Sequence, residues 1–85
     1  MKEFTYTITD PNGLHARPAG ILVKESGKYS SEITLHSCGK KGDAKKIFSV
    51  MGMGIKSGDS VTVKISGADE DNAVGALEVF FKNNL

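Results

Sequence analysis

One short segment of the chain holds a histidine, an arginine and the predicted start of a helix. His15 is followed by Ala16, Arg17 and Pro18, and Gly13 just before it permits a sharp turn of the chain. Proline is tolerated in the first turn of a helix, where its missing N–H removes no internal hydrogen bond. We therefore expect His15 to lie at the N-terminus of a helix.

The start of a helix is a favourable place for an anion. Its first backbone N–H groups lack partners and carry partial positive charge, so the amides of Ala16 and Arg17 can donate to a phosphate. The same field favours a neutral imidazole, which is the nucleophilic form. Arg17 adds a permanently charged, planar fork that can contact phosphoryl oxygens. The segment therefore predicts that His15 accepts a phosphoryl group and that Arg17 stabilises its charge.

The sequence offers little support for other chemistries. It has no Walker-type phosphate loop, no glycine pattern for a dinucleotide and no Gly-x-Ser-x-Gly nucleophile elbow. Two histidines and one cysteine do not form a zinc site, so we expect neither a metal nor a cofactor. His36 has no motif around it and is assigned no chemistry. A carrier needs only a nucleophile, an anion cradle and a docking surface, so we expect a carrier that shares catalysis with its partners rather than an enzyme.

Length, composition and charge favour one small domain over residues 1–85. The chain has 11 basic and 10 acidic side chains, a balance that argues against a dedicated nucleic-acid binder. The single Cys38 cannot form an internal disulfide, which favours a reducing compartment. The first residues do not resemble a signal peptide, and no apolar run is long enough to cross a bilayer. We expect a cytoplasmic monomer that does not insert into a membrane and has proteins as partners.

Hydrophobic periodicity predicts the elements that position this segment. Alternating apolar residues predict strands over residues 3–9, 32–36 and 61–66, and a turn over 37–40 predicts a short additional strand over 41–43. The strand over 61–66 has the clearest pattern, and we expect it to lie centrally in the sheet.

Helical spacing predicts three helices. The first runs over about 16–26, the second is limited to a couple of turns around 47–51 by Gly52, and the third follows the acidic run 69–71. The order is βαββαβα. Strands with one apolar face, and helices with apolar stripes to cover them, predict an α+β domain with an antiparallel sheet and helices on one face.

The segment from Gly13 to Ala19 resembles the active-site signature of HPr, the histidine-containing phosphocarrier family of the bacterial phosphoenolpyruvate:sugar phosphotransferase system. Residues 45–55 resemble the family's short second helix and the loop after it, and residues 67–71 resemble the opening of its C-terminal helix. The resemblance covers essentially the whole chain. It implies the HPr-like open-faced β-sandwich, a four-stranded antiparallel sheet with three helices on one face.

The resemblance also implies partners and a docking surface. Enzyme I, phosphorylated from phosphoenolpyruvate, would transfer its phosphoryl group to Nδ1 of His15, and a sugar-specific IIA domain would then remove it. Partner docking is carried over to Ile47, Phe48 and Met51. Helical spacing cannot bury every apolar group of this segment, and Phe48 is the one we expect to be exposed. A positive rim that steers acidic partners is expected from three lysines: Lys24, Lys45 and Lys46.

The chain departs from the family at one position. Many HPr proteins, especially in Gram-positive bacteria, begin the second helix with a serine that a dedicated kinase phosphorylates, and Lys46 stands there in this chain. A lysine has no hydroxyl, and its charge is the reverse of that of phosphoserine. Ser49, nearly one helical turn later, is the alternative acceptor that the spacing allows.

Two alternatives to a carrier of the sugar system stay open. The histidine motif does not identify the phosphoryl donor, so the chain could be a paralogue in a nitrogen-related or dihydroxyacetone kinase relay. It could also be a regulatory binding module, in which phosphorylation changes the partners rather than feeding transport.

Overall fold

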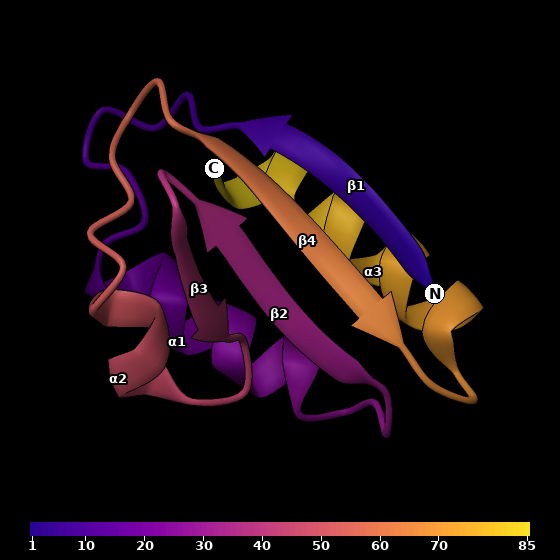
Figure 1. Cartoon of the computed structure of the whole chain (residues 1–85). Coiled ribbons are helices and arrows are strands. Elements are labelled where there is room, and N and C mark those ends of the chain that lie inside the picture. Colours follow the sequence, from indigo (N-terminus) through magenta and orange to yellow (C-terminus); the bar gives the residue numbers. More distant parts are fainter.

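The computed structural model describes residues 1–85 and has the predicted element order, βαββαβα (Figure 1). The strands are β1 (Lys2–Thr7), β2 (Glu32–Ser37), β3 (Lys40–Asp43) and β4 (Ser60–Ser66). The helices are α1 (Ala16–Ser26), α2 (Ile47–Met51) and α3 (Glu70–Asn84). All strand pairs are antiparallel, so the α+β class predicted from the sequence is confirmed.

The sheet has the strand order β1-β4-β2-β3, with β4 in an interior position as its strong alternation predicts. Its register aligns the apolar side chains in rows. Phe4 pairs with Val63, and Leu35 pairs with both Val63 and Gly42, so one row crosses all four strands. Because side chains alternate along a strand, this register directs the apolar residues to one face and leaves the polar ones on the other.

The helices cover only one face of the sheet. Figure 1 shows α1 and α3 behind the strands, with α2 beside α1 next to the outer strand β3. Phe81 of α3 packs edge-to-face on Phe4 and Tyr6 of β1, with ring centroids 5.5 and 5.7 Å apart. Aromatic pairs favour this geometry because the positive edge of one ring meets the negative face of the other. None of the helices combines the length and the apolar character needed to cross a membrane.

The open face of the sheet is polar. Its rows include Thr5 opposite Thr62, Thr62 opposite His36, and His36 opposite Lys41. The Nε2 atom of His36 lies 3.0 Å from the hydroxyl of Thr34 on the same strand. His36 thus occupies the outward side of β2, where it alternates with the buried Leu35.

Candidate phosphoryl-transfer site

His15 is the N-cap residue of α1, so its predicted position at a helix start is confirmed. Its backbone is extended, with φ −85° and ψ −178°, and its carbonyl accepts the first helical hydrogen bond from the amide of Ala19 at 3.0 Å. The imidazole does not cap the helix, and the amides of Ala16 and Arg17 have no protein acceptor. Pro18 follows in the first turn and has no N–H to place. Two amides at the positive end of the helix are therefore free to bind an anion beside His15.

Gly13 fixes how closely the chain before His15 approaches the loop before β4. Its φ is +65°, and the neighbouring amide of Leu14 donates to the carbonyl of Ile55 at 3.1 Å. A Cβ atom on Gly13 would lie 2.6 Å from the carbonyl oxygen of Ile55 and 2.7 Å from Cα of Lys56. Both the backbone conformation and the space require a glycine. The sharp turn predicted from the sequence is confirmed. It brings the chain before His15 against the loop that contains Ile55.

Asp10 organises the turn that leads to His15. Its Oδ1 atom accepts from the amide of Asn12 at 2.9 Å, and its carbonyl accepts from the amide of Gly13 at 2.9 Å. Its own amide donates to the backbone oxygen of Leu85, also at 2.9 Å. The second carboxylate oxygen, Oδ2, lies 3.9 Å from Nε2 of His15. The turn thus places a carboxylate against one side of the imidazole.

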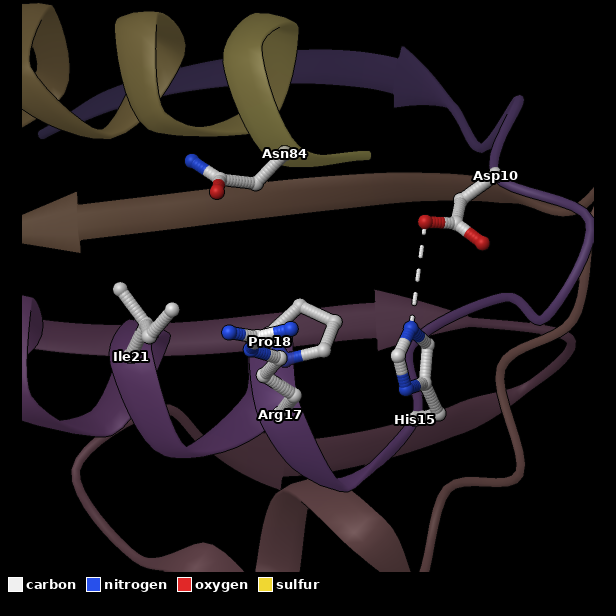
Figure 2. A pocket seen from close by; sticks show the side chains of 6 residues that line it. All are labelled: Asp10, His15, Arg17, Pro18, Ile21 and Asn84. Atoms are coloured by element: carbon white, nitrogen blue, oxygen red, sulfur yellow. Dashed lines mark ion pairs between the residues drawn. The ribbon is translucent and has the colours of Figure 1, made fainter.

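A shallow pocket of about 400 Å³ opens beside the imidazole (Figure 2). Figure 2 shows Nε2 of His15 directed at Asp10, whereas the other ring nitrogen is directed away from that carboxylate. The guanidinium of Arg17 points away from the imidazole and makes no ion pair or hydrogen bond with the protein. His15 and Arg17 therefore line the same pocket without touching each other. The lining residues are Asp10, His15, Arg17, Pro18, Ile21 and Asn84.

Comparison with known proteins identifies the family. Residues 2–83 match the family model described as the PTS HPr component phosphorylation site. This chain belongs to the HPr family. It is 42% identical over 85 residues to phosphocarrier protein HPr of Mycoplasma genitalium, covering 99% of this chain and 97% of that one. It is 46% identical over 78 residues to phosphocarrier protein HPr of Mycoplasma capricolum, covering 92% and 88%.

Comparison with solved structures also matches the chain to HPr. The solved structure of a mycoplasma histidine-containing phosphocarrier protein superimposes with a TM-score of 0.91 at 44% identity, covering 93% of this chain and 90% of that one. The predicted HPr-like open-faced sandwich is confirmed. The chain is thus a phosphocarrier of the HPr type within the phosphotransferase system.

Two polar side chains of this HPr pocket were not found by sequence reasoning. Asp10 begins the Asp-Pro-Asn-Gly run, and aspartate at the first position of a turn often binds a backbone amide through its side chain. That signal could have placed its carboxylate near His15. Asn84 lies in the last turn of α3, where its side-chain amide donates to the carbonyl of Phe80 at 3.0 Å. No local pattern connects Asn84 with His15, because only the packing of α3 against α1 brings them to one pocket.

The predicted docking residues form an apolar surface on α2. Phe48 is 88% exposed, as predicted, and Met51 is 39% exposed, whereas Ile47 is partly buried and packs against the core. Val50, in the same helix, is buried. Figure 1 shows α2 beside the end of α1 at which His15 lies. We call Ile47, Phe48 and Met51 the α2 surface.

The three predicted rim lysines differ in whether the ammonium group is bound within the protein. Lys24 and Lys46 are exposed and form no ion pair or hydrogen bond through their ammonium groups. Lys45 is half-buried, and its Nζ atom donates to the carbonyl of Tyr29 at 2.6 Å. Its charge is therefore fixed against the loop that follows α1, while the other two can move toward a partner.

No group of three or more histidine, cysteine, aspartate or glutamate residues is placed to hold a metal ion. The groups that meet at the pocket are an imidazole, two amides without acceptors and a guanidinium without a protein partner.

Proposed function

We propose that this HPr protein accepts a phosphoryl group from phospho-Enzyme I on Nδ1 of His15 and passes it to sugar-specific IIA domains. The observation that carries the proposal is the position of a 39% exposed imidazole at the start of α1, next to two amides without acceptors. An incoming phosphoryl group at Nδ1 meets positive potential from the helix and can be reached by Arg17. These groups stabilise the phosphoryl charge as it arrives and leaves.

The protein contributes positioning rather than complete catalysis. Holding the nucleophile at a rigid helix start gives partner enzymes a defined target, and orientation of this kind lowers the barrier to transfer. We propose that the 85 residues act as one domain, as a monomer in the cytoplasm, and that the partner enzymes supply the remaining catalytic groups.

The α2 surface supports a docking role. An aromatic ring that is 88% exposed beside a half-exposed methionine is an adaptable contact for successive partners. We propose that the α2 surface docks both Enzyme I and IIA domains, with Lys24 and Lys46 steering their acidic surfaces. Lys45 adds positive charge at a fixed place next to Tyr29.

Regulation by a kinase at α2 lacks a suitable hydroxyl. Lys46 is the N-cap residue of α2 and has none. The hydroxyl of Ser49 accepts a hydrogen bond from the amide of Asp43 at 2.8 Å and is half-buried. A phosphate on Ser49 would break this contact, so we propose that Ser49 stays unmodified when the protein is treated with HPr kinase and ATP. Fragment mass mapping tests this directly.

The decisive test mixes the protein with Enzyme I and phosphoenolpyruvate and follows its intact mass. We expect the gain of one phosphoryl group that is lost in acid and retained in base, and its complete absence in His15→Ala with the fold preserved. Added IIA domain should then remove the group. A His15→Ala protein that still relays phosphate refutes the assignment.

Repeating the assay with the Enzyme I of each relay, and adding partner capture with wild type and His15→Ala, separates the two alternative functions. Phosphorylation only by the Enzyme I of a nitrogen-related or dihydroxyacetone kinase relay would make the protein a paralogue. Equal capture of partners by wild type and His15→Ala, without transfer, would make it a regulatory binding module.

A further inference from the structure

Asp10 is the one carboxylate that faces the imidazole of His15. We propose that Asp10 is a positioning residue that keeps the ring proton on Nε2 and thereby keeps the lone pair on Nδ1. This inference rests on the proposed role of His15 as the phosphoryl acceptor. It assigns to a residue of the preceding turn the choice of which ring nitrogen attacks phosphorus.

The turn holds the Asp10 carboxylate in one orientation. Oδ1 accepts from the amide of Asn12, and the backbone of Asp10 is fixed by hydrogen bonds to Gly13 and Leu85. The side chain is only 26% exposed. With one oxygen held by the turn, the other is left 3.9 Å from Nε2 of His15 (Figure 2). The carboxylate is therefore preorganised rather than a mobile surface group.

An ionised carboxylate accepts hydrogen bonds but donates none, so it favours the ring form whose proton faces it. Nε2 is the nitrogen that faces Asp10, and Nδ1 is then left as the nitrogen with a free lone pair. Arg17 is the other charged group at this pocket, and its guanidinium points away from the ring. Asn84 is neutral and is bound to Phe80. Asp10 thus has no competitor for the proton on Nε2.

The same contact acts during transfer. The Nδ1 lone pair attacks the phosphorus of the donor, the Nδ1–P bond forms, and the bond from phosphorus to the donor atom that carried the phosphoryl group breaks, with its electron pair leaving on the donor. Nε2 keeps its proton throughout, so the ring becomes a phosphoimidazolium cation with Asp10 as its counter-ion. On delivery, a nucleophile of the acceptor forms a bond to phosphorus while the Nδ1–P bond breaks, so its electron pair returns to Nδ1 and the ring is neutral again.

Asp10→Asn gives the sharpest test because it keeps the turn and replaces the hydrogen-bond acceptor that faces Nε2 of His15 with a donor. The asparagine oxygen can still accept from the amide of Asn12, while its NH₂ group replaces Oδ2 and donates toward the ring. A donor at this place favours a lone pair on Nε2 and a proton on Nδ1. Asp10→Ser is the second variant, since its hydroxyl can hold the turn but no carboxylate faces the ring.

Asp71→Asn is the matched control. It removes the same charge from a side chain that is 81% exposed at the start of α3, where Asp71 pairs with Lys2 at 3.4 Å. The last turn of α3, not the first, borders the pocket through Asn84. This variant tests whether a change of net charge alone alters His15.

The experiment measures the ¹⁵N NMR shifts of the His15 ring at a pH above the usual titration range of histidine, with His15→Ala to assign the signals. Wild type and Asp71→Asn should have the proton on Nε2, Asp10→Ser should have a mixture, and Asp10→Asn should have the proton mainly on Nδ1. In parallel, phosphoramidate serves as a small-molecule donor. Its rate of phosphorylating His15 should fall about three- to tenfold in Asp10→Asn, the effect of losing one charge-assisted contact, and stay unchanged in Asp71→Asn.

The possible results separate this inference from the proposed function. A wild-type ring with its proton on Nδ1, or the same tautomer in wild type and both Asp10 variants, overturns the role of Asp10 whatever the rates are. A wild-type protein that gains no phosphoryl group from phosphoramidate or Enzyme I overturns the proposed function instead. The tautomer is measured without phosphorylation, so it decides the role of Asp10 separately.

Discussion

Replacing Gly13 with alanine tests how the structure positions His15. At φ +65° an L-residue is destabilised by about 1–2 kcal/mol. The new Cβ would also lie 2.6 Å from the carbonyl oxygen of Ile55 and 2.7 Å from Cα of Lys56, and these backbone atoms cannot rotate away. Overpacking of this kind adds roughly 1–3 kcal/mol. We therefore expect Gly13→Ala to lower the free energy of unfolding by about 2–5 kcal/mol.

Two further glycines of the chain separate these contributions. Gly39 has φ +76°, but no atom lies within 4 Å of the place that a Cβ would take, so Gly39→Ala measures the backbone cost alone, about 1–2 kcal/mol. Gly20 lies inside α1 with nothing within 4 Å of its Cβ position, so Gly20→Ala should stabilise the protein by about 0.5–1 kcal/mol. The order of stability should be Gly20→Ala, wild type, Gly39→Ala, Gly13→Ala.

Urea unfolding followed by circular dichroism measures all four proteins, with linear extrapolation to water. For a domain of this size, each kcal/mol changes the melting temperature by about 4–8 °C, so thermal melts give an independent check. If Gly13→Ala is no less stable than Gly39→Ala, the close approach to Ile55 and Lys56 is not what requires glycine, and the reasoning fails. Folded Gly13→Ala should also accept phosphate more slowly, because His15 lies two residues beyond the displaced backbone.

Three further predictions concern the α2 surface and the pH dependence of stability. Phe48→Ala should change the free energy of unfolding by less than about 0.5 kcal/mol, because the ring is 88% exposed, but should weaken binding to Enzyme I in a titration; a binding constant equal to that of wild type would exclude it from docking. Hydrogen bonds from the Ser31 hydroxyl and from the amide of Ser30 hold the pKa of Asp69 below its ordinary value of 3.8. Its contribution to stability is therefore present above that pH and lost as the pH falls through the lower pKa of the folded state, so the deficit of Asp69→Asn in urea should shrink in acid; a deficit independent of pH would contradict this. Partial burial, then Lys64 and Lys41, lower the pKa of His36 below 6.5, against an opposing effect of Glu3. Since the unfolded chain then binds a proton more readily, wild type should lose stability as the pH falls below 6.5, and His36→Gln should show a smaller loss over the same range.

The sequence predicted the fold well because its local patterns agree with one another. The alternation of Val61, Val63 and Ile65 predicted an interior strand, and that strand is β4, between β1 and β2. His15 was placed at a helix start from Gly13 and Pro18, two residues whose backbone limits are local and are the same in any fold. Exposure of Phe48 followed from helical spacing, because a short helix cannot bury all of its apolar side chains.

The remaining features of the site depend on contacts between distant segments. The sequence alone predicted the position of His15, the proposed nucleophile, together with the free amides beside it and the exposed ring on α2, because each depends on a few neighbouring residues. Tertiary structure alone decided that Asn84 borders the pocket of His15, that Lys45 binds the carbonyl of Tyr29, and which way Arg17 points. It also decided that one oxygen of Asp10 faces Nε2 of His15, since that carboxylate is oriented by a turn whose backbone is held by the end of α3. Such contacts are set by the packing of helices on the sheet, and no periodicity within a single segment encodes them.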